Sequence, residues 1–312
     1  MHVLFEPGFF SSGPVHTAAA IGAVTAICSA IVGVYTVVRS QSFAGHALTD
    51  LATTGGSGAF YFGFSPLAGF IGGGVIGGGA MDLIGVQRVR SRDLATGIVL
   101  GAATGLAALF LYLDTTKSAT TGATQQILFG SIFTIASSTV PVVIGLSAAT
   151  VALVAVIHRP LLLSSLSPEL ASARGIGLRR IGLLFMLALA VSVGLSSIAI
   201  GTILSTALLI GPAATALRVT RSIGTAMVVA CGLGLLATLL GILLAYDSDY
   251  WVPSSQGLPV SFFVVSVIFL LYLASGLPMV RRHPGHKGSR GRPDRSRVHR
   301  RSGDLSALEP GT

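Results

Sequence analysis

Up to residue 280, the chain alternates apolar stretches of about 20 residues with short segments that contain all of the arginines of this part. A helix needs about that length of apolar sequence to cross the hydrocarbon core of a bilayer. Short loops rich in Lys and Arg stay on the cytoplasmic side of a membrane. The sequence therefore predicts an all-α polytopic membrane protein with its N-terminus outside and its C-terminus in the cytoplasm. Of the eleven basic residues before position 281, all but Lys117 fall in segments expected on one side: Arg39, Arg88, Arg90, Arg92, Arg159, Arg174, Arg179, Arg180, Arg218 and Arg221.

The charge content supports this class. Only 10% of the 312 residues are charged and 52% are hydrophobic, whereas a soluble domain is about one quarter charged. So few charges cannot cover a water-exposed globule. We therefore expect lipid to surround the chain, in the cell membrane.

The arginines also set the number of crossings. Arg39 and Arg88 are expected on the same side, so the residues between them must hold an even number of crossings, which we place at 52–64 and 66–86. The same reasoning puts two crossings into 181–217, a stretch short enough for one helix to be broken or re-entrant. The sum is nine crossings, with eight as the alternative, in a transmembrane domain of residues 1–280. The other spans follow from hydropathy alone: 15–38, 94–113, 137–157, 222–245 and 259–280.

The strong basicity of the chain belongs mainly to its tail, residues 281–312. The tail contains nine of the Lys and Arg residues against three acidic ones, which gives it a net charge of +6. It is rich in Pro, Gly and Ser and has no apolar periodicity, as in disordered segments. We expect it to contact anionic lipid headgroups on the cytoplasmic face. Nucleic-acid binding is disfavoured, because no aromatic residue interleaves the charges.

Glycines crowd two of the expected spans. Gly55, Gly56 and Gly58 are expected to interrupt the first, and the second contains the glycines of 72–79. Small residues let helix backbones approach closely in lipid, which favours a packing role for 72–79. Short, glycine-interrupted spans are also where transporters form their binding sites. For 55–58 both interpretations stay open.

His46 and Asp50 are the candidate metal-pathway residues. They are four residues apart, and so share one face of a helix. An ionisable residue inside a membrane span is costly and marks a transport pathway by default. Imidazole and carboxylate together suit a divalent ion such as zinc or manganese. The alternative is a passive, hydrogen-bonded position at the level of the lipid headgroups.

The longest cytoplasmic segment, 158–180, is predicted to contain a short exposed helix. Ser167 is a good N-cap and Pro168 a good first helical residue, while Glu169 complements the helix dipole. Gly175 can end such a helix in the left-handed conformation. A helix of about two turns can dock into a groove on a partner protein. An ordinary surface connection is the alternative.

Two further features bear on function. Pro212 removes one backbone hydrogen bond in the middle of a span and predicts a kink that neighbouring groups must compensate. The chain lacks the Gly-x-x-x-x-Gly-Lys-Ser/Thr motif that cradles nucleotide phosphates. We expect no cofactor, no ATP site and no catalytic residue on this chain.

From about Phe5 to Met279, the sequence resembles the permeases of the ABC-3 family, the zinc/manganese ABC importers. The resemblance implies a homodimeric or heterodimeric permease, two cytoplasmic ATPase subunits that bind ATP, and an extracellular metal-binding lipoprotein. It also implies that a helix at 164–175 is the coupling helix that meets the ATPase, with Leu170 and Ala171 in its motif. The matching motifs are Glu6-Pro7 with Phe9-Phe10, Val37-Val38-Arg39, Ser42-Phe43-Ala44-Gly45, Ser91-Arg92, Ala95-Thr96-Gly97-Ile98-Val99, Leu128-Phe129-Gly130-Ser131-Ile132, Pro168-Glu169-Leu170-Ala171 and Pro212-Ala213-Ala214-Thr215-Ala216.

The chain departs from the family pattern at two places. The family usually has Gly-Asp-Ala-Leu-Ser-His where this chain has Gly-His-Ala-Leu-Thr-Asp, so His46 and Asp50 exchange acid and imidazole. The family's aspartate before Pro-Glu is Ser167 here. The first hypothesis is thus the permease subunit of an ATP-driven importer of zinc or manganese, with iron as a further candidate. A secondary transporter driven by an ion gradient and a membrane scaffold or sensor are the alternatives.

Overall fold

The computed structural model describes residue 9 and residues 12–84, 92–118, 121–130, 132–251 and 257–277. Over these residues the chain is helical, without strands. Nine helices of 16 to 29 residues dominate this part of the chain. They are α1 (Gly13–Val38), α2 (Ser42–Tyr61), α3 (Pro66–Ile84), α4 (Arg92–Ser118), α6 (Val140–Leu166), α8 (Leu178–Ile200), α9 (Thr202–Val219), α10 (Ile223–Trp251) and α11 (Val260–Ser275).

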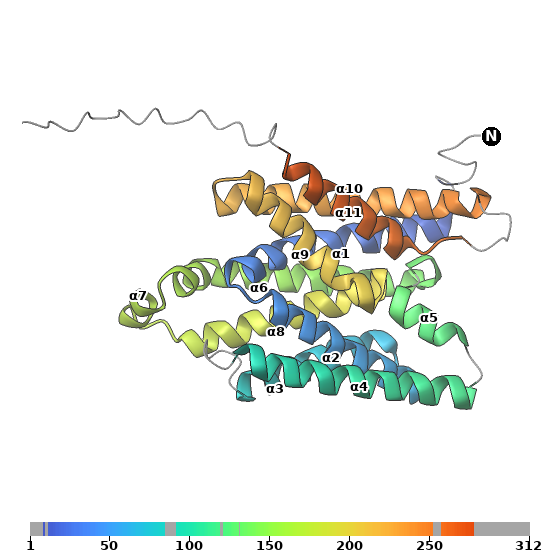
Figure 1. Cartoon of the computed structure of the whole chain (residues 1–312), viewed down its shortest axis with the longest axis horizontal. Coiled ribbons are helices and arrows are strands. Elements are labelled where there is room, and N and C mark those ends of the chain that lie inside the picture. The colour runs from blue at the N-terminus through green and yellow to red at the C-terminus, as the bar shows by residue number, and fades with distance from the viewer. Residues whose placement is uncertain are drawn as a thin grey trace, which may run out of the picture.

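Shorter elements occupy the two ends of this bundle. The six-residue α7 (Pro168–Ala173) lies at one end, whereas α5 (Thr121–Phe129) lies at the other, near the start of α1 (Figure 1). The turns between α1 and α2 and between α9 and α10 lie at the α7 end. The structure thus brings Arg39, Arg174 and Arg218 to one end, as the sidedness argument requires. The orientation of that end toward the cytoplasm stays a prediction.

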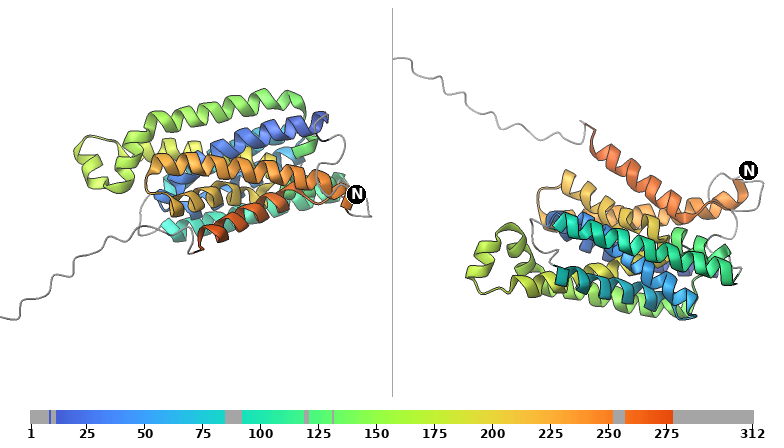
Figure 2. Two further views of the ribbon diagram at one scale, coloured as in Figure 1. Left: turned by 90° about the horizontal axis from the view of Figure 1, so that it is seen from above. Right: turned by 60° about the horizontal axis from the view of Figure 1, so that its bottom comes forward.

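The helices form three groups across the bundle. α2, α3 and α4 pack together on one side, and α10 and α11 pack together on the other (Figures 1 and 2). α1 and α8 lie between these groups and contact both α6 and α9. Ser29 of α1 approaches Ser196 and Ser192 of α8, at 2.6 and 3.3 Å between the hydroxyl oxygens. These three side chains are buried. Hydrogen bonds of this kind commonly stabilise the association of helices in lipid.

Most predicted spans correspond to helices, but several bounds differ. Within the described ranges, six helices are long and apolar enough to cross a membrane, namely α1, α4, α6, α8, α9 and α10, and α3 and α11 contain shorter apolar segments. The two crossings predicted for 181–217 correspond to α8 and α9, which Gly201, with φ +82°, joins directly. The predicted span 52–64 is instead α2, which begins at Ser42. The span predicted to end at 157 continues as α6 to Leu166.

The glycines of α2 and α3 serve close helix contact. A Cβ atom on Gly73 would lie 2.6 Å from the Leu51 carbonyl oxygen and 2.7 Å from the Gly55 Cα atom. A Cβ on Gly55 would clash with the carbonyl oxygen of Gly69. α2 runs without a break through 55–58, so the predicted interruption there is wrong. Gly72 and Gly79 are different, because a Cβ on either meets nothing within 4 Å.

Candidate metal pathway and coupling segment

The candidate metal-pathway residues lie near the start of α2, a helix surrounded by other helices. α2 contacts α3, α4, α8 and α9, so its polar groups can face protein rather than lipid. His46 comes one turn after the start of α2 at Ser42, and Asp50 one turn later. The i, i+4 spacing places both side chains on one side of α2. The predicted shared face is therefore present, within a helix longer than expected.

His46 is directed toward α9. Its Nδ1 atom lies 3.2 Å from the Thr206 hydroxyl oxygen, and Thr206 also lies 3.2 Å from the hydroxyl oxygen of Thr49. Thr49 and His46 are three residues apart and lie on the same side of α2, so the Thr206 hydroxyl is within hydrogen-bond distance of both. The His46 side chain itself is exposed on the single chain. The imidazole is therefore fixed at Nδ1 by Thr206, while the side chain as a whole remains accessible.

Asp50 is directed toward α4. The Thr104 hydroxyl lies 2.5 Å from Asp50 Oδ2 and 2.9 Å from the Leu100 carbonyl oxygen. A second threonine, Thr54, reaches both the Asp50 carbonyl oxygen at 2.9 Å and the Ala103 carbonyl oxygen at 2.8 Å. Asp50 and Thr54, one turn apart on α2, are thus both hydrogen-bonded to α4. Hydrogen bonds of this kind fix the orientation of a carboxylate that contacts a metal.

The arrangement offers few ligands, and they are spread out. His46 contacts Thr206 of α9, whereas Asp50 contacts Thr104 of α4. Over the described residues no group of three or more His, Cys, Asp and Glu side chains could hold a metal ion. Two ionisable ligands with hydroxyls beside them leave most of the coordination sphere of a divalent ion to water or to another chain. Such an open set suits transient contact with a passing ion rather than storage.

Sequence reasoning did not find Thr104 and Thr206. Each is a hydroxyl within an otherwise apolar span, a signal shared with many threonines that only bond their own helix. Thr53 is one example, since its hydroxyl donates to the Thr49 carbonyl oxygen at 2.8 Å. Only the packing of α4 and α9 on α2 separates the two kinds of threonine.

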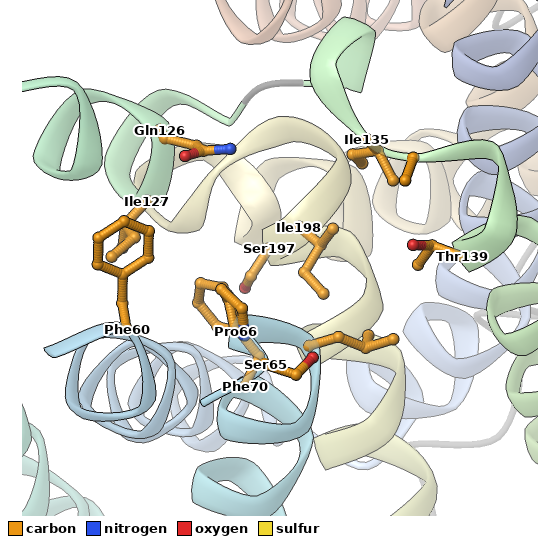
Figure 3. Close-up of a pocket in the computed structure, with 12 residues that line it drawn as sticks. Phe60, Ser65, Pro66, Phe70, Gln126, Ile127, Ile135, Thr139, Ser197 and Ile198 are labelled. Carbon is orange, nitrogen blue, oxygen red and sulfur yellow. The ribbon is translucent and has the colours of Figure 1, made fainter. Parts of the chain in front are cut away.

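A cavity of about 200 Å³ lies at the other end of α2. It is bounded by Phe60 at the end of α2, by Phe70 of α3 and by Ser197 of α8 (Figure 3). Its polar groups are neutral, namely the hydroxyls of Ser65, Thr139 and Ser197 and the amide of Gln126. Without an ionisable side chain in its lining, this cavity is a poor site for a divalent cation, so the candidate site remains the His46 and Asp50 region.

The predicted cytoplasmic helix is present but shorter than 164–175. Residues 164–166 still belong to α6. The helical conformation is interrupted at Ser167, with φ −147° and ψ 83°, before α7 begins at Pro168. Ser167 occupies the N-cap position of α7, as predicted, but its side chain makes no capping hydrogen bond. Its carbonyl oxygen accepts a hydrogen bond from the Ala171 N–H at 3.0 Å. Glu169 lies in the first turn, as predicted.

Gly175 ends α7 as predicted. Its φ is +74°, its N–H donates to the Ser172 carbonyl oxygen at 2.9 Å, and the Ile176 N–H donates to the Ala171 carbonyl oxygen at 3.0 Å. This pair of hydrogen bonds defines a Schellman motif. Ala171 is fully buried, whereas Leu170 is 57% exposed. One side of α7 thus packs against the bundle through Ala171, while the apolar side chain of Leu170 is exposed.

Pro212 lies inside α9, as predicted, and is buried. Because proline has no N–H, the Leu208 carbonyl oxygen loses its helical donor. One turn later the Thr215 hydroxyl donates to the Gly211 carbonyl oxygen at 2.8 Å. That bond goes to a different carbonyl from the one that Pro212 leaves without its helical donor.

Comparison with known proteins agrees with this architecture. The chain is 29% identical over 254 residues to the manganese import system permease protein ScaB of Streptococcus parasanguinis, covering 81% of this chain and 88% of that protein. It is 28% identical over 247 residues to the manganese transport system membrane protein MntC of Listeria innocua, covering 78% and 86%.

The fold also matches a solved structure, PsaBC from Streptococcus pneumoniae in complex with Fab. The TM-score is 0.75 with 24% identity, covering 88% of this chain and 96% of that one. The family model described as the ABC 3 transport family matches residues 14–276. The chain therefore belongs to the ABC-3 family of ABC-transporter permeases, which are multi-pass membrane proteins.

Proposed function

We propose that this chain is the permease subunit of an ATP-driven importer of a divalent metal ion. Manganese is the preferred cargo, with zinc and iron as alternatives. The observation that carries the proposal is the placement of His46 and Asp50 on one helix inside the bundle, each next to a threonine hydroxyl. Carboxylate and hydroxyl oxygens with a single imidazole suit manganese, since carboxylate and water favour that ion. The names of the manganese permeases to which the chain is similar support the same choice.

ATP hydrolysis would take place on a separate ATPase chain. The permease lacks a phosphate-binding motif in its sequence, so the energy must enter through a contact with a partner. α7 is the candidate contact, because it lies at one end of the bundle with Leu170 exposed (Figure 1). We assign the surrounding segment 158–180 to coupling, residues 1–280 to the permease domain and residues 281–312 to a tail that contacts lipid. The tail lies outside the described residues.

A second permease copy, identical or paralogous, would complete the pathway. His46 is exposed on the single chain, and an ionisable side chain within a membrane span normally faces protein or water. A partner permease packed over this face would shield His46 from lipid and supply further ligands. An extracellular metal-binding lipoprotein would deliver the ion to the opposite end of the bundle.

Uptake by the intact complex tests this proposal. The permease would be purified with its ATPase, reconstituted in proteoliposomes and supplied with the binding protein, and uptake of Mn²⁺, Zn²⁺ and Fe²⁺ would be measured with and without ATP. We expect ATP-dependent uptake that His46→Ala and Asp50→Ala each reduce at least tenfold. His16→Ala is the matched control, since His16 is exposed near the start of α1. Uptake that needs an ion gradient and no ATP would favour a secondary transporter, and no metal uptake at all would favour a scaffold or sensor.

A further inference from the structure

Arg39, at the end of α1, contacts both helices that flank α7. Its Nη1 atom donates to the hydroxyl oxygens of Ser164 and Ser165 at 3.0 and 3.1 Å. These serines occupy the last turn of α6, immediately before the break at Ser167. The guanidinium carbon lies 5.5 Å from the ring centroid of Phe185 in α8, the helix that follows α7. One side chain therefore contacts the helix that enters α7 and the helix that leaves it.

A second contact, one turn earlier on α1, strengthens this connection. The Tyr35 hydroxyl forms a hydrogen bond with His158 Nδ1 in α6. The Tyr35 ring packs edge-on against Phe185 of α8, with 6.4 Å between ring centroids. Tyr35 and Phe185 are both buried. The final two turns of α1 are thus joined to α6 and α8 at two levels.

Arg39 also contacts the turn that starts α2. Its Nε atom donates to Gln41 Oε1 at 3.4 Å, and Gln41 is buried. Between them, Ser40 has φ +54°, a left-handed conformation that is unfavourable for residues with a side chain. The Ser40 N–H donates to the Val37 carbonyl oxygen at 2.9 Å. The connection is therefore short and hydrogen-bonded back to α1, so a displacement of the end of α1 acts directly on the start of α2.

The start of α2 is fixed by the same residues. The Gln41 carbonyl oxygen accepts a hydrogen bond from the Gly45 N–H at 2.9 Å, and His46 follows directly. A displacement of the turn therefore reaches the candidate metal ligands within two helical turns. A connection of this kind is a physical route for coupling when both sites bias the same element.

We propose that Arg39 is a positioning residue that transmits movement of α7 to the start of α2, and so to His46 and Asp50. The inference rests on the proposed function, because it takes α7 as the ATPase contact. Arg39 would not touch the metal or ATP. Its role would be to keep the α6–α7–α8 connection and the α1–α2 turn moving as one unit, so that ATP hydrolysis changes the geometry of the metal ligands.

The test compares Arg39→Gln with Arg218→Gln in the reconstituted complex. Arg218 is a matched control because it lies at the same end of the bundle and stacks on Tyr272 of α11, with 5.1 Å to the ring centroid. The measured quantities are complex yield, basal ATP hydrolysis and Mn²⁺ taken up per ATP hydrolysed. For Arg39→Gln we expect normal yield and near-normal basal hydrolysis, with at least a fivefold lower ratio of Mn²⁺ to ATP. Arg218→Gln should keep the ratio of the unmodified complex.

A second variant covers the case in which Arg39→Gln fails to assemble. Replacing Ser164 and Ser165 together by alanine removes two acceptors and leaves Arg39 in place, and we expect the same fall in the ratio. An unchanged ratio in the variant that assembles, or an equal fall in Arg218→Gln, would overturn the proposal. Absence of ATP-dependent uptake of Mn²⁺, Zn²⁺ and Fe²⁺ alike in the unmodified complex would instead refute the proposed function.

Discussion

Thr206 of α9 lies 3.2 Å from both His46 Nδ1 and the Thr49 hydroxyl oxygen of α2. This places a single hydroxyl between two helices at the level of the candidate metal pathway. α9 also contains Pro212, so the helix that orients the imidazole is one with a missing backbone hydrogen bond. The orientation of His46 therefore depends on how α9 packs against α2.

Removing the Thr206 hydroxyl should weaken transport without unfolding the chain. Thr206→Val keeps the shape of the side chain and loses the hydrogen bond to His46. One such bond contributes about 0.5–1.5 kcal/mol, or about two- to tenfold in an equilibrium. We expect Mn²⁺ uptake in proteoliposomes to fall by that factor. Thr206→Ser, which keeps the hydroxyl, should retain most of the uptake, and equal losses in the two variants would contradict a role for the hydroxyl.

Exchanging the two candidate ligands should preserve function better than changing either one. His46→Asp combined with Asp50→His restores the order of acid and imidazole that the ABC-3 pattern usually has. It keeps one carboxylate and one imidazole beside the hydroxyls of Thr206 and Thr104. His46→Asp alone gives two carboxylates, and Asp50→His alone gives two imidazoles, which alters the charge and the ligand set.

We expect the double variant to show ATP-dependent uptake at least fivefold above either single variant, with a changed ratio of Mn²⁺ to Zn²⁺ uptake. Competition between the two ions in proteoliposomes measures that ratio. Equally low uptake in the double and single variants would show that transport requires the imidazole at position 46 and the carboxylate at position 50, and not merely one of each.

The sequence was sufficient to predict the helical membrane class and the shared face of His46 and Asp50. Both depend on local properties, namely hydropathy over about 20 residues and the 3.6-residue period of a helix. The left-handed end of α7 at Gly175 was also predictable, because glycine has no steric penalty there.

The start of α2 and the contacts of Thr104 and Thr206 could not be predicted in this way. Residues 42–51 contain His46 and Asp50, and their low hydropathy hides a helix that is stable because α3, α4, α8 and α9 surround it. These features depend on packing between segments far apart in sequence. Ser167 takes the predicted N-cap position without a side-chain hydrogen bond, a detail of its rotamer that the sequence does not contain.

The packing role of glycine gives a stability prediction. Gly73→Ala should destabilise the protein, since its Cβ would lie 2.6 Å from the Leu51 carbonyl oxygen and 2.7 Å from the Gly55 Cα atom. Overpacking of this type costs about 1–3 kcal/mol. Gly72→Ala is the neighbouring control, because its Cβ meets nothing within 4 Å and alanine favours a helix. Thermal unfolding in detergent should give a lower midpoint for Gly73→Ala only. A normal midpoint for Gly73→Ala would mean that α2 and α3 can move apart without loss of stability.

The end of α7 gives a prediction about the ATPase contact. Gly175→Ala places a side chain at φ +74°, which costs about 1–2 kcal/mol. The Schellman motif that includes the Ser172 carbonyl oxygen should loosen, and α7 should lose its fixed position. Gly177→Ala is the matched control, because Gly177 has φ −69° and a Cβ there makes ordinary contact with Arg180, at 3.5 Å or more.

Binding of the purified permease to its ATPase, measured by titration in detergent, distinguishes the two variants. We expect Gly175→Ala to weaken binding by about five- to thirtyfold, the factor that corresponds to 1–2 kcal/mol. Gly177→Ala should bind like the unmodified permease, because the backbone conformation there suits alanine. If both variants bind normally, the ATPase does not depend on the shape of α7, and the assignment of this segment to coupling is wrong.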